Sequence, residues 1–258
     1  MELSFAQLFE GSAITFNLVI MWVVSIAILR RYQETKYLPA LLAASGFLVL
    51  GFIFSPLLLI MVIVIQAHPE LVSAAWVKIL AIINNNAFVI GLFLFTIFTR
   101  QVFRPGQRGS LFFLILIGIL LFGSKDMILM FDAKGGIMQW NARFEARLMY
   151  TIGNSLNFGW LAYESLARWR LYRKQLREGK ELDPLVVNRF LLWGLAGISY
   201  AVSSLVTILN VPYEQVQPLF PSIVKAIFIF TFAFFSYLSW SPPEWYKQTV
   251  LKGEPARA

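Results

Sequence analysis

Seven long apolar stretches, separated by short polar connections, follow one another along this chain of 258 residues. A helix that crosses a bilayer needs about 20 mostly apolar residues, and each stretch is close to this length or exceeds it. The pattern therefore predicts an all-α integral membrane protein, a seven-transmembrane helix bundle that forms a single domain over residues 1–258. The predicted spans are residues 12–30, 38–66, 75–98, 110–131, 146–168, 189–210 and 220–240.

Two local signals refine this pattern. Pro56 lies well inside the second stretch, and we expect a kink or tilt there because proline removes a backbone donor and clashes with the preceding turn. The fifth span is followed by a basic run that has the pattern of a continuing helix. Gly179 is its predicted C-cap, and Asp183 and Pro184 are predicted to open the sixth span.

The distribution of basic residues predicts the orientation of the chain. Most of the 22 basic residues lie in the connections after the first, third and fifth spans and in the C-terminal tail. Lys and Arg in short loops are retained on the cytoplasmic side of a membrane, so we expect the N-terminus outside and the C-terminus in the cytoplasm. The first residues include Glu2 and Glu10 but no basic residue, unlike the start of a cleaved signal peptide. We therefore expect the first span to stay in the protein.

The composition agrees with a membrane protein, because 58% of the residues are hydrophobic and only 14% are charged. The net charge of +8 follows from the loop cations, so we expect no nucleic acid as a partner. Cysteine is absent and His68 is the only histidine, which removes disulfides, thiol chemistry, Cys/His zinc sites and haem held by paired histidines. The residue sets of intramembrane hydrolysis are also missing, so we expect no enzymatic activity, no metal and no cofactor.

Three consecutive amides, Asn84, Asn85 and Asn86, interrupt the third apolar stretch near the predicted bilayer midplane. Consecutive helical residues are about 100° apart, so these side chains diverge and at most one of them faces lipid. An amide in hydrocarbon without a partner costs several kcal/mol. We therefore expect polar groups of other spans to meet them at this depth.

Four spans supply candidates for such a polar layer. The candidate ligand-binding residues are Asn84, Asn85 and Asn86, with Asn154 and Asn157 of the fifth span, Ser199 and Ser203 of the sixth span, and Asn17 of the first span. Two interpretations stay open. The layer either joins packed helices through hydrogen bonds, or lines a water-containing cavity that takes a small polar or lipid-like ligand.

Charged residues near the cytoplasmic end of the fifth span form a second candidate site. Glu164 precedes Arg168 by one helical turn, in the order that favours a local ion pair, and the same two residues are candidates for a gate. The basic continuation of this helix offers a rigid surface to a protein partner at the cytoplasmic face. Its candidate contact residues are Arg170, Arg173, Lys174 and Arg177.

A short internal similarity relates the first three spans to the last three. Asn17 and Arg30 in the first span have the same spacing as Asn157 and Arg170 in the fifth. Two units of three helices in the same orientation, joined by the fourth span, would explain this similarity. Parallel repeats of this kind occur in transporters.

The segments "DPLVVNRFLLWG", residues 183–194, and "SWSPPEWYK", residues 239–247, resemble segments of bacterial seven-transmembrane proteins of sensor type. Such proteins often precede cytoplasmic kinase or nucleotide-cyclase domains. The resemblance implies a location in the bacterial cytoplasmic (inner) membrane. No output domain follows the second segment in this sequence, so the resemblance also implies action through a separate partner.

Three functions are compatible with these observations. The first is a non-enzymatic membrane receptor, sensor or accessory subunit, in which a polar intramembrane pocket binds a ligand and a cytoplasmic or membrane partner receives the signal. The alternative is a small-solute transporter or channel with a 3+1+3 helix arrangement. A further alternative is a structural subunit of a membrane complex.

Overall fold

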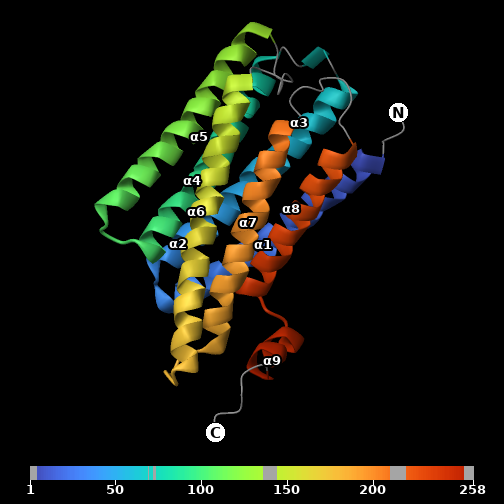
Figure 1. Ribbon diagram of the computed structural model, residues 1–258. Coiled ribbons are helices and arrows are strands. Elements are labelled where there is room, and N and C mark those ends of the chain that lie inside the picture. The colour runs from blue at the N-terminus through green and yellow to red at the C-terminus, as the bar shows by residue number, and fades with distance from the viewer. Residues whose placement is uncertain (1–4, 69, 72–73, 136–143, 210–218, 253–258) are drawn as a thin grey trace.

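The computed structural model describes residues 5–68, 70–71, 74–135, 144–209 and 219–252, and every regular element in these ranges is helical (Figure 1). The longer elements are α1 (Phe5–Thr35), α2 (Leu38–Leu48), the π-helical segment η1 (Val49–Phe54), α3 (Ser55–Ala67), α4 (Ala75–Phe103), α5 (Arg108–Gly135), α6 (Phe144–Arg177), α7 (Pro184–Leu209), α8 (Leu219–Trp240) and α9 (Glu244–Lys252). The all-helical class predicted from the sequence is confirmed over these residues.

Five helical segments within the described ranges are long and apolar enough to cross a membrane, judged by length and composition. They correspond to the predicted first, second, third, sixth and seventh spans, and their composition indicates a lipid environment. α5 is apolar over a shorter length, Arg108–Ser124, and α6 is more polar than the five. Crossings by α5 and α6, and with them the count of seven spans, stay predictions.

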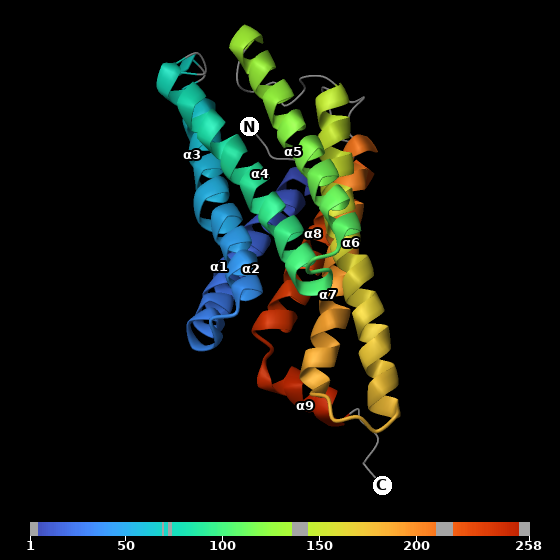
Figure 2. The same ribbon diagram turned by 90° about the vertical axis from the view of Figure 1, so that its left-hand side faces the viewer.

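The long helices lie side by side and alternate in direction, so that their ends gather at two ends of the bundle (Figures 1 and 2). α1, α4, α6 and α8 finish at the same end, where α9 also lies. The exposed residues Arg30, Arg108 and Arg170 belong to this end, which we call the basic end. The alternation agrees with the predicted spans, and the placement of the basic end in the cytoplasm stays a prediction.

Among the described residues, α1, α2, α4, α6, α7 and α8 close a ring, because each packs against the next and α8 packs against α1. α5 lies outside this ring and contacts α4 and α6 (Figure 2). The contact between α6 and α7 is close, since a Cβ atom added to Gly197 would lie 2.8 Å from the carbonyl oxygen of Phe158. Small residues allow membrane helices to approach each other in this way.

The second predicted span is built from three consecutive segments, α2, η1 and α3. The π-helical segment η1 ends directly before Ser55 and Pro56. The Ser55 hydroxyl donates a hydrogen bond to the carbonyl oxygen of Leu50 at 2.7 Å. Proline cannot continue the regular backbone ladder, and the helix is distorted where Pro56 predicted a distortion.

The connection between α6 and α7 has the predicted local structure. Gly179 adopts a φ of +79°, in the left-handed region that glycine tolerates. Its amide donates to the Leu176 carbonyl and the Lys180 amide donates to the Gln175 carbonyl, both at 3.0 Å. These two bonds form a Schellman motif, so the C-cap prediction is confirmed. The carboxylate of Asp183 caps the first turn of α7, as expected for the residue before Pro184.

Aromatic side chains fill the bundle from its middle to the basic end. Phe47, Phe95, Phe158 and Phe232 are almost completely buried, each on a different helix of the ring. The ring centroids of Phe47 and Phe95 are 4.9 Å apart, and those of Phe158 and Phe232 are 5.8 Å apart, both in edge-to-face geometry. Trp193 of α7 packs into the same cluster. This part of the core is therefore rich in closely packed aromatic side chains.

Candidate functional site

The three consecutive amides of α4 point in different directions, as the helical rotation requires. Asn84 is buried, with 2% of its surface exposed, and shares its helix face with the buried residues Val77 and Ala81. Asn85 and Asn86 are partly exposed, and the Asn86 amide donates to the Ile82 carbonyl of its own helix at 2.8 Å. Asn84 is thus the member of the triplet that faces the interior of the bundle.

Asn154 of α6 joins two helices through one half of its amide. Its Nδ2 atom donates to the hydroxyl of Ser204 on α7 at 2.6 Å and lies 3.4 Å from the hydroxyl of Tyr150. Ser204 in turn donates to the carbonyl oxygen of Tyr200 at 3.0 Å. The Oδ1 atom of Asn154 is buried and meets no donor among the described residues.

Asn157, one turn further along α6, has a different role because both halves of its amide are paired. Its Oδ1 atom accepts a hydrogen bond from Thr96 Oγ1 at 3.0 Å, and its Nδ2 atom donates to the carbonyl oxygen of Leu92 at 2.8 Å. Both partners belong to α4, so Asn157 connects α4 to α6. This arrangement corresponds to the helix-packing interpretation of the polar layer.

The two candidate serines of α7 also bond within their own helix. Ser199 Oγ donates to the Leu195 carbonyl and Ser203 Oγ donates to the Tyr200 carbonyl, each at 2.9 Å. Serine commonly satisfies its hydroxyl in this way inside an apolar helix. The Ser199 bond leaves its oxygen with lone pairs that can still accept a donor.

Several buried oxygen atoms in the half of the bundle opposite the basic end meet no donor within the described ranges. Three are amide carbonyl oxygens on three different helices, and two are hydroxyl oxygens. They are Oδ1 of Asn17, Asn84 and Asn154, and Oγ of Thr151 and Ser222. A buried acceptor without a partner destabilises the folded protein by about 1–3 kcal/mol. A hydrogen-bond donor from outside the described part of the protein would therefore stabilise this half of the bundle.

An aromatic contact series connects the surroundings of Asn84 and Asn154. Phe88, one turn from Asn84 on the same helix, stacks on Phe54 with 4.3 Å between ring centroids. The Phe88 ring also lies 5.6 Å from the Tyr150 ring, and Tyr150 neighbours Asn154 through its hydroxyl. The two amides therefore belong to one continuous region between η1, α4 and α6.

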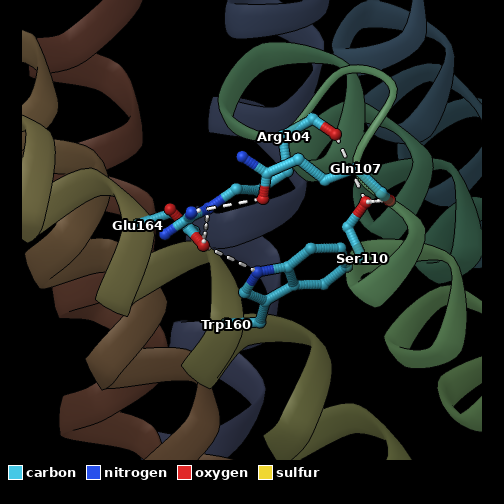
Figure 3. A network of polar contacts seen from close by, with 5 residues as sticks. All are labelled: Arg104, Gln107, Ser110, Trp160 and Glu164. Atoms are coloured by element: carbon cyan, nitrogen blue, oxygen red, sulfur yellow. Dashed lines mark hydrogen bonds and ion pairs between the residues drawn. The ribbon is translucent and has the colours of Figure 1, made fainter.

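The second candidate site lies nearer the basic end (Figure 3). Oε1 of Glu164 lies 2.8 Å from Nε of Arg104 and accepts a hydrogen bond from Trp160 Nε1 at 3.2 Å. Arg104 Nη1 also donates to Oε1 of Gln107 at 3.3 Å, and Ser110 ties the same loop to the start of α5. Hydrogen bonding and the charge of Glu164 raise the pKa of Arg104, so the arginine stays charged. The network joins the end of α4 to α6.

This geometry corrects the partner expected for Glu164. The predicted ion pair between Glu164 and Arg168 is wrong, because the Glu164 carboxylate points to α4 and pairs with Arg104 instead. The guanidinium of Arg168 lies 5.7 Å from the ring of Tyr172 on its own helix. The local spacing favoured Arg168, but the packing of α6 against α4 turns the Glu164 face toward Arg104.

The candidate partner surface lies on the final turns of α6 at the basic end. Arg170, Arg173, Lys174 and Arg177 are all exposed there. Arg173 lies 5.2 Å from the ring of Trp169, and Lys174 forms an exposed ion pair with Glu178 at 3.7 Å. The surface is thus a basic helix end with both local contacts made along the helix.

The sequence alone did not single out Arg104 and Trp160 as partners of Glu164. A signal was available, because a carboxylate inside a membrane helix needs a cation, and Arg104 ends the helix that packs beside it.

Comparisons with protein-family models, with curated proteins and with solved structures found no match to this chain. The proposed function therefore depends on the site itself.

Proposed function

We propose that the chain is a non-enzymatic membrane receptor or accessory subunit that binds a small ligand in the half of the bundle opposite the basic end. The observation that carries this proposal is the set of buried amide oxygens of Asn17, Asn84 and Asn154, which meet no donor in the described part of the chain. These atoms are acceptors only, so the ligand is a donor: a small amine, a polyol or another molecule rich in N–H or O–H groups.

The proposal also includes a way for ligand binding to affect a protein partner. Asn154 and Asn157 lie on α6, whose following turns carry Glu164 and then the exposed Arg170, Arg173, Lys174 and Arg177. A ligand that moves α6 relative to α4 would act on the Arg104–Glu164 ion pair, which joins these two helices. In the proposed orientation the basic end faces the cytoplasm of a bacterial cell, and the exposed basic turns of α6 contact the partner.

A second candidate function, a small-solute transporter with two units of three helices, is favoured by the order of packing. α1 packs against α8, and α6 packs against α4, so the first helix of each supposed unit contacts the last helix of the other. Two units related by a two-fold axis would produce this reciprocal arrangement. The aromatic cluster of Phe47, Phe158 and Phe232 argues against it, because this cluster closes the half toward the basic end.

The test uses the purified full chain in detergent micelles, with ethanolamine and glycerol as donor probes and acetate as an acceptor probe. A donor probe should raise the unfolding temperature, because a ligand that binds the folded state and not the unfolded state stabilises the folded state increasingly as its concentration exceeds its Kd. The shift should vanish in Asn84→Leu and persist in Asn86→Leu, whose amide is partly exposed and bonds to its own helix.

Flux of the same probes into reconstituted vesicles separates the two functions. Binding without flux supports the receptor or subunit, and flux that disappears in Asn84→Leu supports the transporter. A response to acetate alone, or a donor response that Asn84→Leu leaves intact, contradicts the proposed site.

A further inference from the structure

A second group of unpaired polar atoms lies at the basic end, where α8 packs against both α1 and α7. Nε of Arg189, on α7, donates to the carbonyl oxygen of Ser239 in the last turn of α8 at 2.9 Å. The guanidinium carbon of Arg189 lies 5.2 Å from the centroid of the Trp240 ring. The start of α7 is thus fixed against the end of α8 by a guanidinium group.

Capping explains only part of this arrangement. A cation beside the last carbonyl groups of a helix is stabilised by the helix dipole, and this accounts for the Nε bond. Within the described residues Arg189 forms no ion pair, and its two Nη groups retain donors that the cap does not use. A planar guanidinium fork with free Nη donors matches the geometry of a phosphate or carboxylate.

A second arginine contributes positive charge at the same end of the bundle. Arg31 lies near the end of α1, which packs against α8, and its charge acts on Arg189. The carboxylate of Asp183 is engaged in capping α7. An anion beside the two guanidinium groups would relieve their repulsion, which is only partly screened near the membrane interface.

Two neighbouring donor groups also indicate an anion site. The hydroxyl of Ser239 and Nε1 of Trp240 are buried and meet no acceptor from the residues that the structure describes. Trp240 ends α8, and tryptophan at the end of a membrane helix lies at head-group level. Positive charge and unpaired donors therefore coincide at the depth where lipid phosphates are found.

We propose that the ends of α1 and α8 and the start of α7 form a binding site for a phosphate-bearing anion, held between Arg31 and Arg189 beside Trp240. The chemistry is shared by an anionic lipid head group and by free phosphate. In either case the anion neutralises the two guanidinium groups and joins three helices at the basic end.

The experiment measures the unfolding temperature of the full chain in phosphatidylcholine nanodiscs, alone, with phosphatidylglycerol added, or with inorganic phosphate added. The site predicts stabilisation by at least one of the two anions. Arg31→Gln should weaken that binding by roughly 10- to 100-fold, the range of a charge-assisted hydrogen bond. Arg30→Gln, which removes the same charge from the preceding exposed position, should bind as the native chain does.

Arg189→Lys keeps the charge but loses the planar fork, so it should also weaken binding if it folds. If Arg189→Lys does not fold, Arg31→Gln still tests the proposal, because Arg31 is exposed. An effect of phosphatidylglycerol alone identifies a lipid head group, and an effect of phosphate alone identifies a free anion. The proposal is overturned if neither anion stabilises the chain, or if Arg30→Gln and Arg31→Gln reduce binding equally.

Discussion

The same substitution at two asparagines of the polar layer should change stability in opposite directions. Asn84 and Asn157 are both buried, but Oδ1 of Asn84 meets no donor among the residues described, whereas Asn157 uses both halves of its amide between α4 and α6. Leucine is close to asparagine in size and needs no hydrogen bond. Asn84→Leu therefore removes an unpaired group, and Asn157→Leu removes two interhelical bonds.

The magnitudes follow from these contacts. Removing a buried acceptor without a partner recovers about 1–3 kcal/mol, so Asn84→Leu should raise the free energy of unfolding by about that amount. Interhelical hydrogen bonds in membranes contribute roughly 0.6 kcal/mol on average and up to about 1.7. Asn157→Leu should therefore lower the free energy of unfolding by about 1–3 kcal/mol.

The assay is reversible denaturation of the full chain in mixed detergent micelles, followed by circular dichroism, with no ligand added. Asn86→Leu is the control and should differ less from the native chain, because the Asn86 amide is partly exposed. If Asn84→Leu is destabilised as strongly as Asn157→Leu, then Asn84 holds helices together and the proposed ligand site loses its central observation.

Three further predictions use the same denaturation assay. Arg104→Gln should destabilise the chain by about 3 kcal/mol and Glu164→Gln by about 1 kcal/mol or less. The first change leaves the carboxylate of Glu164, 9% exposed, without its cation, whereas the second leaves the more exposed Arg104, at 38%, without its anion. Equal losses of stability would contradict this reasoning. Gly197→Val should lower the free energy of unfolding by about 1–3 kcal/mol or more, because its Cβ atom would lie 2.8 Å from the Phe158 carbonyl oxygen. Gly159→Ala is the control and should have a smaller effect, because its Cβ atom would meet no neighbour within 4 Å. Gly179→Ala should cost about 1 kcal/mol, because its φ of +79° is unfavourable for alanine, and Gly179→Asn should lose less.

Local signals in the sequence predicted local structure well. Gly179, Asp183 and Pro184 end and begin helices where the sequence placed these boundaries, because each acts through its own backbone and its immediate neighbours. The distortion beside Pro56 has the same local origin. α9 was not predicted, although Glu244 after the proline pair is a recognisable start of a helix.

The polar contacts were harder to predict because they depend on how helices rotate against each other. The sequence showed that Asn84, Asn85 and Asn86 diverge, but not which of them faces inward, since rotation about the α4 axis is set by packing. For Glu164 the spacing favoured Arg168 on the same helix, yet the partner is Arg104 on α4. In a bundle of apolar helices, hydrophobic pattern alone leaves this rotation weakly defined, and the close packing of small residues decides it.

The distribution of polar and aromatic groups along the bundle supports the proposed receptor function over the alternative transporter. A solute that crosses the bundle would have to pass the rings of Phe47 and Phe158, which each pack against Phe232, between α2, α6 and α8. The buried amide oxygens without donors all lie on the other side of these rings. In the proposed receptor, a ligand bound there would act on the basic end by shifting helices, because densely packed side chains transmit displacement. α6 is suited to this task, since it carries Asn154 on one side of the rings and Glu164 on the other.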